Sequence, residues 1–146
     1  MKRIIYLIFA ACLLITGYAQ AQSLSEMVDV CANQAGEDAT YLKDFQVVLG
    51  EATADQRPPV ARYPLVLSKN NIYRFSVCDS ENSEGKAVIK LYDSNRMIFS
   101  SYLENTQEEY NPFNFMCQKT GIYHVFISFL DGKQGEAIGI LSYVNK

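Results

Sequence analysis

The chain has 146 residues, with 13 lysines and arginines against 16 aspartates and glutamates, so its formal net charge at pH 7 is −3. No basic cluster stands out along it. This argues against binding to nucleic acid or to anionic lipid surfaces, because both are recognised through concentrated positive charge. Residues 22–146 suit a single domain, since a chain of that size buries roughly two-thirds of its unfolded surface.

The first 21 residues have the pattern of an export signal. A basic Lys2-Arg3 start is followed by an apolar stretch over 4–15 and by the small-residue pattern Ala19-Gln20-Ala21. The apolar stretch is shorter than the roughly 20 residues that a membrane-spanning helix needs, so we expect no transmembrane anchor after cleavage. A retained anchor and acylation at Cys12 are the alternatives. We therefore expect an exported protein that is periplasmic, outer-membrane-associated or secreted.

A short N-terminal helix is predicted over about 23–35. Ser23 and Glu26 have the spacing of a capping box. One apolar stripe recurs at helical intervals and contains Leu24, Met27, Val28 and Cys31. Gly36 is expected to end the helix. We expect the stripe to dock against a sheet; a free helix that binds a partner is the alternative.

From Ala39 onward, apolar and polar residues alternate with a period of two, which predicts strands with one buried face. The expected strands cover 41–49, 63–67, 72–78, 87–92, 97–103, 113–118, 122–130 and 137–144. A polar, proline-containing loop over 51–62 separates the first two, and Pro64 places the second at a sheet edge. About eight strands without an intervening helical period predict an all-β fold, a two-sheet antiparallel β-sandwich that is jelly-roll-like.

Two details of strand arrangement follow from the same pattern. The strands over 122–130 and 137–144 are apolar on both faces, which predicts central strands; the alternative is that one of them lies under the helix. The segments 113–118 and 122–130 flank the turn Lys119-Thr120-Gly121 and give the strongest hairpin signal in the chain.

Three cysteines remain if the leader is removed, namely Cys31, Cys78 and Cys117, and an oxidising compartment permits a disulfide. Because Tyr73 and Val77 share one strand face, Cys78 points to the opposite face. Cys117 is expected on the core side, so a Cys78–Cys117 bridge would need a bulge or a shifted strand end. A Cys31–Cys78 pairing is geometrically freer and is our candidate, but the pairing stays open.

No constellation of catalytic, cofactor-binding or metal-ligating residues is evident, so we expect no enzyme and no cofactor. His124 is the single histidine, and neither a nucleophile elbow nor a Cys-x-x-Cys pair accompanies it. The loop 79–85 is rich in oxygen ligands but lacks the glycine position and the final bidentate glutamate of a calcium loop. A solvated loop is the simpler interpretation.

Ten tyrosines and no tryptophan invite a comparison with sugar-binding surfaces. Tyr73, Tyr92 and Tyr123 fall in apolar alternation, and most of the tyrosines are predicted to lie in the core with their hydroxyls at a polar rim. Tyr102 and Tyr110 flank an acidic stretch and are the pair expected to be exposed. They are our candidate ligand-binding residues.

Several short motifs resemble the exported β-sandwich of the bacterial pre-peptidase C-terminal type. They are Tyr73-Arg74-Phe75, Leu91-Tyr92-Asp93, Phe113-Asn114-Phe115 and Thr120-Gly121-Ile122-Tyr123. The similarity covers about 63–144 and implies a non-catalytic accessory module of the kind usually appended to secreted enzymes. Here no enzyme is attached, and the cysteine-bearing helix lies outside the pattern. This departure favours a stand-alone envelope protein.

The sequence therefore leads to one functional expectation and one alternative. We expect an exported, non-catalytic β-sandwich that acts by binding a protein partner, as an accessory or subunit of a cell-envelope assembly. The alternative is a module that binds glycan or calcium.

Overall fold

A computed structural model describes residues 23–145. The expected export signal lies outside the described residues. The chain forms the helix α2 (Leu24–Asn33), the short 3-10 helix η1 (Leu130–Gly132) and the strands β1 (Ala39–Leu49), β2 (Ala61–Leu67), β3 (Ile72–Asp79), β4 (Ala87–Asp93), β5 (Arg96–Ser100), β6 (Tyr102–Leu103), β7 (Glu108–Glu109), β8 (Phe113–Met116), β9 (Gly121–Phe129) and β10 (Gly135–Val144). No helix in this described part is long and apolar enough to cross a bilayer.

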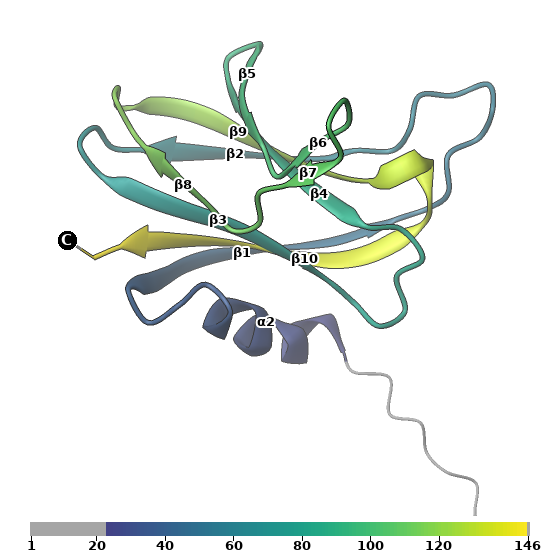
Figure 1. Ribbon diagram of the computed structural model, residues 1–146, viewed down its shortest axis with the longest axis horizontal. Helices are drawn as coiled ribbons and strands as arrows, with labels where there is room; N and C mark the ends of the chain where they lie inside the picture. The colour runs from purple at the N-terminus through teal and green to yellow at the C-terminus, as the bar shows by residue number, and fades with distance from the viewer. Residues whose placement is uncertain (1–22, 146) are drawn as a thin grey trace, which may run out of the picture.

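Two four-stranded antiparallel sheets face each other (Figure 1). The first sheet has the order β1-β10-β3-β8 and the second the order β2-β9-β4-β5. Strands β6 and β7 form a separate small hairpin. Consecutive long strands alternate between the sheets except at β4 and β5, which is the topology of a jelly roll. The predicted all-β sandwich is confirmed, with β9 and β10 central and the Pro64 strand at an edge.

The hairpin expected around Lys119-Thr120-Gly121 is wrong. Strand β8 pairs with β3 in the first sheet, whereas β9 pairs with β2 and β4 in the second. The turn residues do reverse the chain, but they carry it across the core from one layer to the other. Alternation reports only that each strand buries one face, so it cannot tell a hairpin from a crossing of this kind.

The strand expected over 97–103 is also divided. The backbone N–H of Ser101 donates to the Ile89 carbonyl at 2.9 Å, and the Ser101 hydroxyl accepts from the Ile89 N–H at 3.0 Å. One buried serine therefore satisfies both backbone groups of Ile89 where the ladder of β4 and β5 ends. The chain bends there into β6 and leaves the sheet.

The core lies between the inner faces of the two sheets. Its fully buried side chains include Phe45, Leu67, Phe75, Ile89, Leu91, Val125 and Ile127. These residues alternate along their strands as the sequence predicts. Gly139 of β10 lets the layers approach, because a Cβ there would lie 2.7 Å from Cδ1 of Ile127. Close packing of this kind is the main contribution to the stability of the sandwich.

Helix α2 lies along the outer face of the first sheet (Figure 1). Ser23 and Glu26 form the predicted capping box. Met27 and Cys31 pack on Ile138 and Ile140 of β10, and all four side chains are buried. The expected docking of the apolar stripe is therefore confirmed. It shields from water the two isoleucines, which would be exposed on the sheet without the helix.

Two further links hold α2 to the sheet. The Cys31–Cys78 disulfide, whose Cα atoms are 6.1 Å apart, joins the helix to β3 and confirms the candidate pairing, while Cys117 is a buried free thiol. Arg74 donates from Nη1 to Asp38 Oδ1 at 2.6 Å and from Nη2 to Oδ2 at 2.9 Å. The same guanidinium donates to the Ala35 carbonyl just after the helix. The bidentate geometry fixes the connection between α2 and β1.

Loss of the disulfide should lower stability without changing the fold. We expect Cys31→Ser to reduce the free energy of unfolding by about 2–5 kcal/mol, because the unfolded chain regains the freedom of a long loop. Urea denaturation followed by circular dichroism measures the change. Cys117→Ser is the matched control, since it leaves the disulfide in place. An equal loss in both variants would contradict this role.

The Arg74–Asp38 pair should make stability depend on acid pH. The hydrogen bond from Arg74 holds the pKa of the Asp38 carboxyl below its usual 3.8. A lowered folded-state pKa stabilises the folded form above the unfolded value, and this contribution is lost as pH falls through the folded value. Asp38→Asn should therefore lower the urea midpoint at pH 7, and the difference from the parent should shrink below pH 3.8. Glu37→Gln is the control and should not show this trend.

Candidate binding surface

The two outer faces of the sandwich differ in what covers them. On the first sheet, Ile138 and Ile140 lie under α2 and are buried. On the second sheet, Val66, Ile122 and Met97 are 70%, 61% and 46% exposed. Within residues 23–145, no helix covers that face. The outer face of β2, β9, β4 and β5 is therefore the larger candidate surface, and we call it the open face.

A row of stacked side chains crosses the open face. The Arg62 guanidinium lies over the Phe126 ring, 5.0 Å from its centroid, and the Phe126 and Tyr92 rings stack at 4.4 Å. Tyr92 was expected in the core with Tyr73 and Tyr123, but of the three it alone lies on an outer face, opposite His124. A flat aromatic surface with a cation at its edge offers both apolar contact and charge.

Charge on the open face is positive, although the whole chain is acidic. Arg62 and Lys90 lie at outer positions of the second sheet, whereas its one carboxylate, Asp93, is paired with Arg96 and, by register, lies on the side of Tyr123. His124 lies on the outer side of β9, as its alternation with Phe126 predicts. Its Nδ1 is buried without a hydrogen-bond partner among the described residues. The surface is thus suited to a partner that presents acidic groups beside apolar ones.

One end of the second sheet is hollowed, and we call this space the end hollow. Its volume is about 580 Å³. The loop 50–60 and η1 lie at this end of the sandwich (Figure 1), where the Ala52 N–H donates to the Gly132 carbonyl at 2.7 Å. Six polar side chains line the hollow, namely Lys90, Tyr102, Glu104, Gln107, Ser128 and Asp131. Lys90 and Ser128 come from the sheet, and the others come from the β6–β7 hairpin and η1.

The two candidate tyrosines are not brought together. Tyr102 pairs with Glu109 across the β6–β7 hairpin, and the Tyr110 N–H donates to the Ser101 carbonyl, so Tyr102 and Tyr110 lie on opposite faces of the hairpin. Tyr102 lines the end hollow. Tyr110 is 42% exposed and meets the Phe99 ring edge-on. Its hydroxyl donates to Glu108 at 3.0 Å, and this hydrogen bond raises the pKa of Tyr110.

Lys90 and Ser128 were not among the candidates predicted from the sequence. Both are polar residues at outer positions of strongly apolar strands, and that parity is the signal that could have identified them. Glu109 also has a part here, because it forms an ion pair with Lys86 next to β4. This contact joins β7 to the second sheet and so positions the hairpin beside the hollow.

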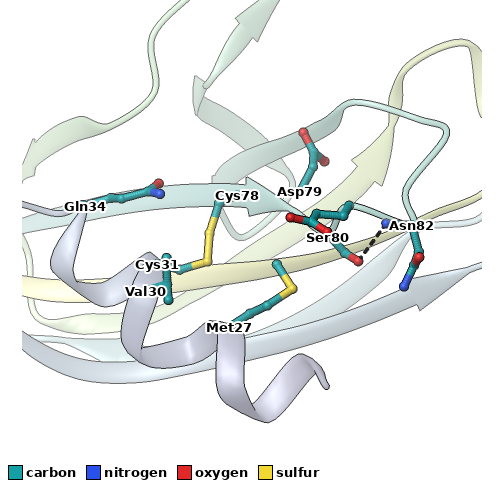
Figure 2. A pocket seen from close by; sticks show the side chains of 9 residues that line it. Met27, Val30, Cys31, Gln34, Cys78, Asp79, Ser80 and Asn82 are labelled. Carbon is teal, nitrogen blue, oxygen red and sulfur yellow. Dashed lines mark hydrogen bonds between the residues drawn. A yellow bond between two sulfur atoms is a disulfide. The ribbon is translucent and has the colours of Figure 1, made fainter. Parts of the chain in front are cut away.

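A smaller space of about 190 Å³ lies between α2 and the loop that follows β3 (Figure 2). The Cys31–Cys78 disulfide is at its floor, and the Ser80 hydroxyl accepts from the Asn82 N–H at 3.1 Å beside it. Asp79 Oδ1 accepts from the Ala87 N–H at 2.8 Å, which ties the two ends of the loop after β3 together. Across residues 23–145, no three side chains of His, Cys, Asp or Glu gather in a way that could hold a metal ion.

The structure is similar to two solved proteins at low sequence identity. One is PliG of Aeromonas hydrophila, a periplasmic lysozyme inhibitor of g-type lysozyme, with 12% identity, a TM-score of 0.48, and coverage of 74% of this chain and 88% of PliG. The other is the pre-peptidase C-terminal domain of a collagenase from Bacillus anthracis, with 14% identity, a TM-score of 0.46, and coverage of 70% and 89%. This second structure is a domain of the type that the short sequence motifs resemble. Neither similarity is close enough to support a function.

No protein-family model and no curated protein matches the sequence.

The stacked row on the open face should contribute measurably to stability. Phe126→Leu keeps an apolar side chain but removes the contacts of the ring with Arg62 and Tyr92. We expect it to lower the free energy of unfolding by about 1–2 kcal/mol, measured by urea denaturation. Ile122→Leu, on the same strand face, should change it by less than about 0.5 kcal/mol. A Phe126→Leu variant as stable as the parent would contradict the contribution of the row.

Proposed function

We propose that this chain is an exported, non-catalytic β-sandwich that binds a protein partner through its open face, as an accessory or subunit of a cell-envelope assembly. The partner surface is apolar and carries acidic groups. The observation that supports this most directly is the exposure of Val66 and Ile122 on the same face that carries Arg62 and Lys90. Exposed apolar side chains gathered on one surface are a common mark of an interaction site.

The asymmetry between the outer faces supports the choice of the open face. The first sheet uses α2 to remove Ile138 and Ile140 from water. The second sheet has no such cover within residues 23–145. A binding partner would bury Val66 and Ile122 in the same way that α2 buries the isoleucines, and this burial would provide the apolar part of the binding free energy.

Charge supports the proposed chemistry of the partner. Arg62 is exposed at the end of the stacked row, and Lys90 lies directly beside Phe126 in the paired strand. Both cations are on a chain with a net charge of −3. Contact between the open faces of two copies would bring these cations together, so it is less favoured than association with an acidic surface, because positive and negative surfaces steer each other together.

Export is supported by the disulfide and by the leader pattern. The Cys31–Cys78 bond joins α2 to β3, and structural disulfides form in oxidising compartments. A periplasmic, outer-membrane-associated or secreted location fits this requirement. The non-catalytic part of the proposal is supported by the position of His124, which is paired with Tyr92 across β4 and β9 and shares its strand face with Phe126.

A capture experiment with matched variants tests the proposal. The purified chain with its disulfide formed is immobilised and incubated with an envelope extract of the native cell, and bound proteins are quantified by mass spectrometry. We expect one partner at near-stoichiometric amount, with recovery that falls as salt rises. Ile122→Asp should reduce its recovery at least about tenfold, because it places a carboxylate in an apolar, positive surface.

Val48→Asp is the control for this experiment. Val48 is 63% exposed, against 61% for Ile122, but lies on β1 of the first sheet. It tests whether any exposed aspartate on the sandwich has the same effect. Equal loss of capture in both variants, or undiminished capture by Ile122→Asp, would contradict binding through the open face.

A further inference from the structure

We propose that the end hollow is a second binding site, for a neutral saccharide. This site is separate from the protein contact proposed for the open face. Its volume of about 580 Å³ is within the range of 300–1,000 Å³ that is typical of small-molecule sites. It is formed where three separate segments meet: the outer face of β4 and β9, the β6–β7 hairpin, and the loop 50–60 with η1.

The six polar side chains of the hollow are free to bind a ligand. Within the described residues, none of their side-chain polar atoms forms a hydrogen bond or an ion pair with the protein, in contrast to neighbouring Lys86 and Glu109, which pair with each other. Convergent polar groups without partners on one concave surface are a feature of binding sites. Water occupies such groups until a ligand with matching hydroxyls replaces it.

The mixture of donors and acceptors indicates the class of ligand. Lys90 and the Gln107 amide donate, Glu104 and Asp131 accept, and the hydroxyls of Tyr102 and Ser128 can do both. A sugar hydroxyl both donates and accepts, so it can use every one of these groups. The half-buried side chain of Val60 lies among them and can contact a C–H face of a sugar ring.

Charge in the hollow argues against ionic ligands. Two carboxylates, Glu104 and Asp131, oppose one cation, Lys90, so an anion would meet net negative charge. Metal sites in proteins draw on His, Cys, Asp or Glu ligands, and no three such side chains gather in a way that could hold a metal ion among residues 23–145. A neutral polyol avoids both difficulties. Tyr102 presents an aromatic side chain with a polar tip at the rim, which suits a ring with one apolar and one polar side.

Binding is tested first with an array of purified neutral and uronate-containing oligosaccharides. The probe protein is the chain with its disulfide formed. We expect binding to neutral oligosaccharides, and the best of these is then titrated by isothermal calorimetry. Tyr102→Ala should weaken its affinity at least tenfold. Tyr110→Ala is the matched control, because it removes a tyrosine from the opposite face of the same hairpin, and it should retain affinity within twofold. Thermal unfolding establishes that both variants are folded.

Three results would overturn the saccharide site. The first is an array on which no neutral oligosaccharide binds. The second is equal loss of affinity in Tyr102→Ala and Tyr110→Ala, which would indicate a general effect on the hairpin. The third is tighter binding of uronate-containing than of neutral oligosaccharides by the parent chain, which would indicate an anionic ligand.

The same variants separate this inference from the proposed protein contact. Ile122→Asp should leave saccharide binding within twofold of the parent while it abolishes partner capture, and Tyr102→Ala should do the reverse. A peptide or protein that requires Tyr102 and not Ile122, with no saccharide bound, would assign the hollow to the protein partner and overturn the saccharide site.

Discussion

Attachment of α2 to the first sheet determines which surface of the sandwich is available. Met27 and Cys31 cover Ile138 and Ile140, the disulfide to Cys78 holds the helix in place, and the second sheet is left with Val66 and Ile122 in water. Without that cover, both outer faces would be partly apolar and neither would be distinguished. Because the helix covers one face within the chain, the proposed partner contact is assigned to the other face.

Much of the fold follows from side-chain parity along the strands. Parity placed Cys78 on the outer face of β3, away from Tyr73 and Val77, and this is where the helix meets it. The proline rule placed β2 at an edge. Parity fails at the step from β8 to β9, because a turn followed by an alternating strand reads the same whether the chain stays in one sheet or crosses to the other. In a jelly roll most connections cross, so pairing partners are set by packing of distant segments.

The candidate sites were predicted less well, and for a related reason. Tyr102 and Tyr110 flank one acidic stretch, so the sequence suggests a pair, but the short hairpin between them turns their side chains to opposite faces. Lys90 and Ser128 are far apart in sequence, yet they lie on adjacent strands and line the same hollow. Their meeting depends on the register of β4 and β9. No local pattern encodes that register, which results from the fit of Ile89 and Ile127 in the core.

The open face and the end hollow share the strands β4 and β9, and Lys90 belongs to both. It lies beside Phe126 in the paired strand and also lines the hollow. A saccharide that accepts a hydrogen bond from the Lys90 ammonium in the hollow would hold this cation away from an acidic partner on the open face. Inner side chains of these two strands, such as Leu91 and Val125, are fully buried and fix the backbone in place. The two proposed sites thus share one cation on a rigid sheet, and occupation of the hollow would weaken the electrostatic part of partner binding.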